Sequence, residues 1–327
     1  MTDREAGAHE AGKRDMGRQD TKDRPFFSDE ERFAELINRN VYRGEKILLP
    51  ENLTLLRRVY PSLSGISGEK ERDVVMKDRK LNICYGLEIE TESDYSMPER
   101  VMVYDACEYE YQIREIHKRH MSDGDYDSYR EKKSRMKEAD FLLPMITTVL
   151  YLGEGHWEAR YKLSQMFWHS AEERALVGFQ DYSFPLIEAD FVKPEDYQTD
   201  LRDFFQAMQC RRDKKRLIKL LQTERFRYLD RQTEQVIAVH LNMKGLVQKM
   251  EKENKPMCKA VQDWIEDERN KGRREGIKEG KREGKREGKK EEKIQIIRRM
   301  QEKGLEESLI RQMTKCTKAE FAAAAGR

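Results

Sequence analysis

The strongest constraint on the fold is a ten-residue stretch in which apolar and polar side chains alternate strictly. Residues 81–90 read LNICYGLEIE, with leucine, isoleucine or tyrosine at every odd position. A period of two predicts a β-strand with one apolar face. Glu88 and Glu90 end the other face, and side chains two residues apart on a strand point the same way, about 7 Å apart. Two carboxylates in one patch are unfavourable unless water or a cation compensates their charge.

A second extended run precedes this strand, and together the two predict a hairpin. Residues 73–77 read DVVMK, and the polar residues 78–80 separate the two runs as a turn. Strand pairing would bring Asp73 beside Glu88 and Glu90. Carboxylate oxygens suit Mg²⁺ or Mn²⁺, and a bound cation would activate a water and hold a scissile phosphate. The alternative is that both glutamates lie on a solvated sheet face, with Asp73 in a turn.

The rest of the pattern predicts a mixed sheet with helices packed on it. Apolar residues have helical spacing at 26–42 and again at 93–120. Residues 141–153 are a continuous apolar run, which is typical of a buried central strand. A second extended run covers 184–192, and residues 197–264 are mainly helical. The order helix, hairpin, helix, strand, helix indicates an α/β protein.

Charge is distributed unevenly along the chain. The 327 residues carry a net charge of +2, but from Lys271 to the end 18 Lys and Arg stand against 10 Asp and Glu. A basic segment of this kind is expected to meet a polyanion. On a helix, six residues would form a basic stripe able to contact DNA phosphates: Lys281, Arg282, Lys285, Arg286, Lys289 and Lys290. A soluble spacer without a partner is the alternative.

These patterns suggest five segments. They are a disordered leader at 1–24, a core at 25–195, a helical extension packed on the core at 196–268, a charged linker or exposed helix at 269–292 and a short helical hairpin at 293–327. Glycines recur every four residues in the fourth segment, and each weakens a helix by about 1 kcal/mol relative to alanine. We therefore expect that segment to be frayed if it is helical.

Several classes of protein are disfavoured by what the sequence lacks. No apolar run is long enough to span a bilayer, and the N-terminus has no apolar stretch typical of a secretory signal. The five cysteines are scattered without a CxxC pair, as in reduced cytoplasmic proteins. No glycine-rich phosphate loop follows a strand. We expect a cytoplasmic protein with no membrane contact and no nucleotide cofactor; self-association is left open.

Several blocks of the sequence resemble the PD-(D/E)XK nuclease family transposases, relatives of the recombination-promoting nucleases. The blocks are RFAELINRNVYRGEKILLPENL, ERDVV, YGLEIETESDYSMPERVMVYDACEY, LLPMITTVLYLGEGHW, PLIEADF and RYLDRQTEQVIAVHLN, followed by the glycine–glutamate–lysine tail. Together they cover nearly all of the chain after about Pro25. The resemblance implies a restriction-endonuclease-like mixed sheet flanked by helices, with a helical C-terminal extension. It also implies an Mg²⁺- or Mn²⁺-dependent DNA endonuclease linked to recombination or mobile elements.

The resemblance further implies which residues form the site. Asp73 and Glu88 match the acids of the first two motifs and would bind the metal. Glu90 stands at the third position, where lysine is usual in the superfamily and glutamine is frequent in these relatives. Glutamate cannot stabilise developing negative charge, though it can ligate a metal or take a proton from water. A catalytically degenerate nuclease fold that binds DNA or assists assembly is therefore the alternative, and a protein-interaction scaffold is a third.

Three further residues are candidate supports of the site. Glu35 lies on the first helix, where some superfamily members add an acid, but an exposed helical glutamate is the simpler interpretation. Arg100 and Tyr104 match the family block MPxRxMxYDA and would hold phosphate or support the acids; packing and surface pairing explain them equally well. His117 and His120, three apart on the same helix, are interpreted as a solvated helix end rather than as a metal-binding pair.

Overall fold

The computed structural model describes residues 22–56, 59–60, 70–241 and 257–326. The chain forms two compact units, Met1–Val261 and Gln262–Arg327. The leader expected at 1–24 lies outside the described residues, except for its last three residues, which are helical.

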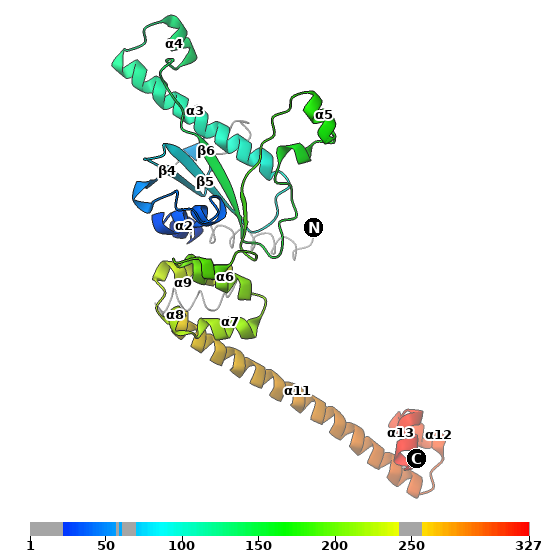
Figure 1. The fold of residues 1–327 in the computed structure, drawn as a ribbon. Helices are drawn as coiled ribbons and strands as arrows, with labels where there is room; N and C mark the ends of the chain where they lie inside the picture. Colours follow the sequence, from blue (N-terminus) through cyan, green and yellow to red (C-terminus); the bar gives the residue numbers. More distant parts are fainter. Residues whose placement is uncertain (1–21, 57–58, 61–69, 242–256, 327) are drawn as a thin grey trace. The chain divides into compact units, whose positions relative to one another are not determined.

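The first unit contains a five-stranded mixed sheet with the strand order β1-β4-β5-β6-β7 (Figure 1). Its strands are β1 (Leu53–Leu55), β4 (Val74–Asp78), β5 (Ile83–Glu90), β6 (Met145–Tyr151) and β7 (Leu186–Glu188). Pairing is antiparallel from β1 through β4 to β5, and parallel from β5 through β6 to β7. The carboxyl ends of β5, β6 and β7 therefore meet at one edge of the sheet. A separate two-stranded sheet pairs β2 (Val59–Tyr60) with β3 (Lys70–Glu71).

Helices cover both faces of the sheet, with α2 (Glu30–Asn40) on one and α3 (Met97–Asp123) on the other (Figure 1). The alternation of β5 decides which side chains meet which helix. Tyr85 points to the α2 side, where its hydroxyl lies 2.7 Å from the hydroxyl of Tyr42. The even-numbered residues of β5 face α3, so the polar face of this strand is covered by a helix.

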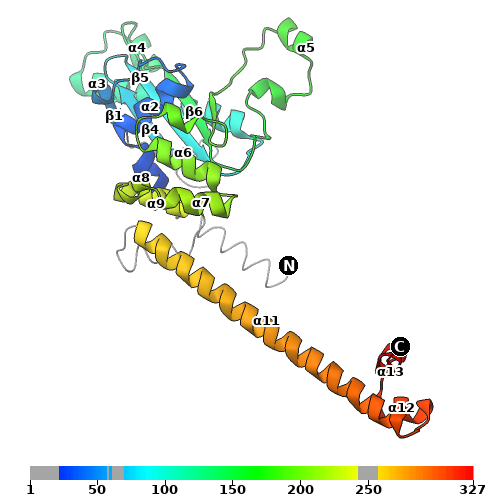
Figure 2. The ribbon, with the colours of Figure 1, turned by 60° about the horizontal axis from the view of Figure 1, so that its bottom comes forward.

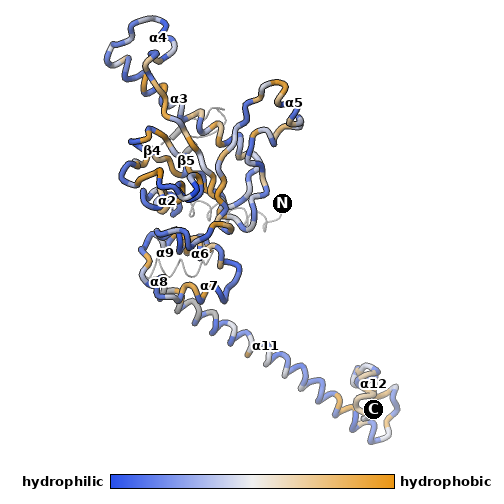
Figure 3. The backbone as a smooth tube through the Cα atoms, viewed as in Figure 1, coloured by the Kyte–Doolittle hydropathy of each residue, from blue (hydrophilic) through white to orange (hydrophobic). Residues whose placement is uncertain are grey.

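The structure confirms the predicted α/β class, a mixed sheet flanked by helices. The predicted hairpin is formed by β4 and β5, with Asp73 directly before its first strand. The predicted central strand is β6, which lies between β5 and β7 and is buried along almost its whole length. Figure 3 shows the apolar residues of this central region in orange.

The described residues 196–241 of the expected helical extension contain four helices, which lie together on one side of the sheet (Figure 2). They are α6 (Leu201–Cys210), α7 (Lys214–Leu221), α8 (Glu224–Arg227) and α9 (Arg231–His240). Arg32 on α2 joins them to the core, because its guanidinium pairs with Asp200 at 3.2 Å and with Asp230 at 2.8 Å. Half-buried ion pairs of this kind fix the orientation of the extension on α2.

The connection from β6 to β7 forms an arm whose base packs on the start of α3. Trp157 and Phe184 share one apolar cluster with Met97 and Val101 on the first two turns of α3. The arm therefore starts and ends beside the helix that follows β5. Its short helices are η2 (Leu163–Met166) and α5 (Ala171–Leu176), and two further 3-10 turns are η1 (Pro50–Asn52) and η3 (Pro194–Asp196).

The far end of α3, beside α4 (Tyr129–Ser134), contains a buried histidine. His120 is 6% exposed, with Nδ1 lying 2.6 Å from Asp125 and Nε2 lying 2.8 Å from Asp140. Burial lowers the pKa of His120, but the hydrogen bonds and charges of the two aspartates outweigh burial and raise this pKa above its ordinary value. The interpretation of His120 as part of a solvated helix end is therefore wrong.

We expect the turn closed by His120 to lose stability as the pH rises. A histidine whose pKa is raised in the folded state stabilises the fold fully below its unfolded pKa near 6.5, and this contribution is lost as the pH rises through the folded pKa. The melting temperature of His120→Gln should therefore fall further below that of the wild type at pH 6 than at pH 9. His169→Gln, at an exposed histidine, is the control. Its melting temperature should differ from that of the wild type by the same small amount at both pH values. This prediction would be contradicted if the melting temperatures of His120→Gln and the wild type differed by the same amount at pH 6 and at pH 9.

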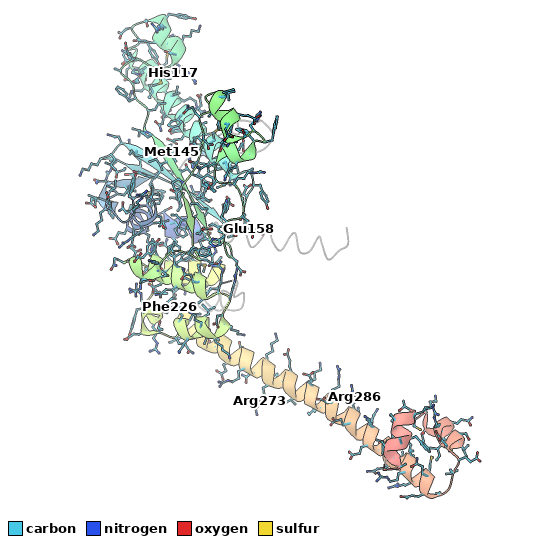
Figure 4. All side chains as sticks on the ribbon, turned by 45° about the vertical axis from the view of Figure 1, so that its right-hand side comes forward. His117, Met145, Glu158, Phe226, Arg273 and Arg286 are labelled. Atoms are coloured by element: carbon cyan, nitrogen blue, oxygen red, sulfur yellow. The ribbon has the colours of Figure 1, made fainter. Side chains whose placement is uncertain are left out.

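The glycine-rich segment at 269–292 is helical and belongs to α11 (Met257–Glu302). All six residues of the expected basic stripe are exposed on this helix, and Figure 4 shows Arg273 and Arg286 projecting away from it. Of the two expectations for this segment, the structure shows the exposed helix. Although α11 is long, it is hydrophilic (Figure 3), and no helix in the described part of the chain has the length and apolar character needed to cross a bilayer.

The C-terminal residues form a small helical cluster. The end of α11 packs with two short helices around Ile297, Ile310, Cys316 and Ala324. A hairpin of two helices was expected at 293–327, so the last helix is an addition. Its sequence signal is a capping box, in which Thr317 and Glu320 bond reciprocally to backbone amides. The two short helices are α12 (Glu307–Thr314) and α13 (Lys318–Ala324).

Candidate active site

The predicted acids of the first two motifs lie close together at one end of the β4–β5 hairpin. The strand pairing ends there with Val74 of β4 and Leu87 of β5. Asp73 directly precedes Val74, and Glu88 directly follows Leu87. The Asp73 carboxylate also accepts a hydrogen bond from the amide of Ile89 at 2.7 Å. Asp73 therefore ends the strand pairing directly beside Glu88.

Glu88 is buried under α3 and forms an ion pair with an arginine. Its side chain is 3% exposed, and its Oε1 lies 2.9 Å from Nε of Arg72, whose side chain is fully buried. The same guanidinium lies 3.1 Å from Asp105 on α3 and also donates to the hydroxyl of Thr147 on β6. The solvated-face interpretation is thus wrong for Glu88. Buried charges persist only when they are paired and hydrogen-bonded, and this network meets that condition for Glu88.

A glycine on β5 provides the space for this arginine. A Cβ atom at Gly86 would lie 2.5 Å from Nη2 of Arg72 and 2.8 Å from side-chain atoms of Met145 and Thr147. Side chains do not approach a Cβ so closely, so any larger residue would displace the guanidinium. Gly86 and Glu88 share one face of β5. Glycine is needed at position 86 because the guanidinium of Arg72, which pairs with Glu88, fills the space that a side chain would occupy.

Glu90 faces a second arginine at the edge of the site. Arg100, on the first turn of α3, lies 2.9 Å from Glu90 and 2.6 Å from Asp94. The guanidinium carbon of Arg100 is 5.9 Å from the centre of the Tyr104 ring, and that of Arg72 is 5.3 Å from it. Arg100 and Tyr104 therefore both lie beside the predicted acids. Glu90 and Arg100 keep part of their surface exposed, at 19% and 27% of their side chains.

The electrostatics of the cluster favour additional positive charge. Burial raises the pKa of Glu88, although the charge of Arg72 opposes the rise, and burial likewise raises the pKa of Glu90 against the charge of Arg100. A raised pKa means that the fold favours the neutral form of the carboxyl group. A proton or a metal cation bound at Glu88 or Glu90 would therefore reduce the cost of burying their charge.

The three predicted acids do not form a three-carboxylate cage. Glu88 forms an ion pair with Arg72 and Glu90 forms one with Arg100, while Asp73 accepts a hydrogen bond from a backbone amide. Over the described residues, no group of three or more His, Cys, Asp or Glu side chains is arranged to hold a metal ion. Mg²⁺ is commonly bound by one or two carboxylates together with waters and substrate phosphates. Two carboxylates are the number which that pattern requires, and Asp73 and Glu88 are the two residues that the sequence predicted as metal ligands.

Glu35 is engaged away from these acids. Its carboxylate accepts hydrogen bonds from the amides of Gln198 and Thr199, at 2.6 and 3.0 Å, and from the hydroxyl of Thr199. It lies on α2, which covers the sheet face opposite to that of Glu88. Glu35 therefore anchors the segment that leads into α6, and the interpretation as a supporting acid is not supported.

Sequence reasoning missed the buried partners of the site. Arg72 directly precedes Asp73, and Asp105 directly follows Tyr104 in the block that carries Arg100. Thr147 and Tyr182 complete the network, because both hydroxyls donate to Asp105. A charged residue beside a candidate acid is a weak signal, since most such residues are solvated. Only the packing of α3 on the sheet shows that Arg72 and Asp105 are buried.

Comparisons of this chain with protein-family models, with curated proteins and with solved structures gave no match. The class supported by the fold itself is an α/β protein with a mixed sheet and an acidic site at the end of its antiparallel hairpin. Any narrower assignment depends on the chemistry of the site.

Proposed function

We propose that this protein is a metal-dependent DNA endonuclease of the PD-(D/E)XK type, with a role in recombination or in mobile elements. One observation carries the proposal: Asp73 and Glu88 lie beside each other at the end of an antiparallel hairpin, and the hairpin is followed by a helix and a parallel strand. A restriction-endonuclease-like core presents its acids on such a hairpin. The resemblance of the ordered sequence blocks supports the same assignment.

In this proposal Asp73 and Glu88 hold Mg²⁺ or Mn²⁺. The metal, when bound, supplies a water that ionises near neutral pH and positive charge for the scissile phosphate. Glu90 orients the attacking water or takes its proton. Arg100 contributes the positive charge that the superfamily places at the position of Glu90, because its guanidinium lies 2.9 Å from that carboxylate. The Tyr104 ring would support both arginines through cation–π contacts, since it lies 5.3 Å from the guanidinium carbon of Arg72 and 5.9 Å from that of Arg100.

The second candidate is a DNA-binding or assembly protein that keeps the fold without catalysis. The buried Arg72–Glu88 pair favours it, because Glu88 already has a cationic partner at 2.9 Å. A metal bound at Glu88 would have to share this carboxylate with Arg72. The replacement of lysine by Glu90 favours the same candidate.

Supercoiled plasmid separates the two candidates. We expect the purified wild type to nick plasmid when Mg²⁺ or Mn²⁺ is added, and to stop when a chelator removes the metal. Asp73→Asn, purified in parallel, controls for contaminating nucleases and should be inactive. Binding of plasmid without nicking in either metal would reject the endonuclease and support the second candidate. A protein that neither nicks nor binds DNA at low salt would reject both.

A further inference from the structure

A dense group of cations lies beside the candidate active site, at the turn between α6 and α7. Residues 211–219 read RRDKKRLIK, with six Lys or Arg among nine residues. Arg211 fastens this turn to the loop after β6, because it donates to the carbonyl of Gly153 at 2.6 Å and pairs with Asp190 at 2.8 Å. Only 10% of its side chain is exposed, so Arg211 is a structural anchor.

The same loop leads directly to the site. The amide of Leu152 donates to the carbonyl of Glu90 at 2.7 Å, and Gly153 is the next residue. A side chain at Gly153 would collide with the Tyr151 ring, 2.3 Å from its Cβ, so the loop passes close to the end of β6. The cationic turn and the acids therefore share the carboxyl edge of the sheet.

A surface cavity of about 360 Å³ lies between the cationic turn and this loop. Arg212 and Arg216 line it, and both are exposed. Arg212 pairs with Glu154 at 2.8 Å, with both side chains 59% exposed; such surface pairs contribute little, so a phosphate can replace the glutamate. Arg216 has no carboxylate within ion-pair distance among the described residues. Two guanidinium groups are thus available to an anion.

An exposed aromatic pair adjoins these arginines. Phe191, which also lines the cavity, is 51% exposed. Its ring stacks on His156 with the centroids 3.7 Å apart and the planes 4° from parallel. The side chain of His156 is 71% exposed. Exposed aromatic rings beside cations are the means by which proteins hold single-stranded nucleic acid, stacking on the bases and pairing with the phosphates.

We propose that Arg212, Arg216 and the His156–Phe191 pair form a subsite for a single-stranded segment of DNA next to the cleavage site. The inference rests on the proposed function and extends it. A single strand fits better than a duplex, because an exposed ring can stack only on an unpaired base. From Leu152 to His156 the chain spans at most about 14 Å, which is roughly four nucleotides at about 3.4 Å per step.

Fluorescence anisotropy in chelator, where no cleavage occurs, tests the subsite with a labelled single-stranded oligonucleotide and its duplex. The wild type should bind the single strand more tightly. R212A/R216A should weaken single-strand binding at least about tenfold at low salt. Losing two phosphate contacts should also reduce the slope of log K against log salt by about 1.4. F191A should weaken binding by about tenfold, the size of one lost base stack.

The matched control is K132A/K133A, which removes two exposed cations from α4 and should bind as the wild type does. Unchanged binding by R212A/R216A and F191A, or a preference for duplex, would overturn the subsite, even if the wild type nicks plasmid. Single-strand binding that depends on these residues without nicking would support the subsite and overturn the endonuclease. A wild type with no DNA affinity would overturn both.

Discussion

Replacing Arg72 by methionine should lower the free energy of unfolding by about 3–5 kcal/mol, the usual cost of removing one partner from a buried ion pair. Arg72 is fully buried, and its loss leaves both Glu88 and Asp105 without their cation. Methionine fills part of the volume but supplies no donor. Chemical denaturation at pH 7 in the presence of chelator measures the effect. Arg130→Met, at an exposed position on α4, should change stability by less than about 0.5 kcal/mol.

The pH dependence of the Arg72→Met effect follows from Glu88. Burial raises the pKa of Glu88 in the folded protein. A carboxyl group whose pKa is raised by folding is neutral in the folded protein at low pH, so it costs no folding stability below its unfolded pKa near 4.5. The loss of stability from burying the ionised carboxylate grows as the pH rises through the folded pKa. Arg72→Met should therefore be closer to the wild type at pH 5 than at pH 7. A loss below about 1 kcal/mol at pH 7 would show that the network contributes little.

Exchanging Glu88 for glutamine should slow metal-dependent plasmid nicking by at least about 100-fold. A catalytic metal contributes several kcal/mol of charge stabilisation in the transition state, and each 1.36 kcal/mol is a factor of ten in rate. Glutamine keeps the shape of the side chain but removes the charge that attracts the cation. Single-turnover nicking rates at saturating metal, compared with rates across a metal titration, would separate lost metal affinity from lost chemistry.

The control for this exchange is Glu92→Gln, at an exposed residue two positions after β5. It makes the same chemical change and should leave the nicking rate within about threefold of the wild-type rate, since surface substitutions seldom disturb a fold. Melting temperatures of all three proteins exclude unfolding as the cause of a lost rate. Nicking by Glu88→Gln at the wild-type rate would remove Glu88 from the site.

The residues with strong local patterns were predicted well. The alternation of LNICYGLEIE and the polar turn before it predicted both strands of the hairpin, and Asp73 lies beside Glu88 at its end. The apolar run at 141–153 predicted β6. These features depend on interactions between residues close in sequence or on a period that one buried face imposes. Arg100 and Tyr104 were found through the sequence block that they share with the resembled family.

The environment of each acid was not predictable from such patterns. Glu88 was expected in a metal-binding cage or on a solvated face, and its partner is instead Arg72. Glu35 was a candidate support of the acids, but it holds the chain at Gln198 and Thr199, more than 160 residues away. Sequence periodicity shows which face of an element is apolar, but it does not show which element covers the other face.

The sequence by itself thus determined the hairpin, the central strand and the presence of Asp73 and Glu88 at the end of that hairpin. Only the tertiary structure decided that α3 covers the polar face of β5, that Gly86 admits the guanidinium of Arg72, and that Asp105 and Thr147 complete its shell. The physical reason is burial. A carboxylate under a helix needs a partner at hydrogen-bonding distance. Here the partners come from the segment before β4, from α3 and from the neighbouring strand β6, which is distant in sequence and which only folding brings to β5.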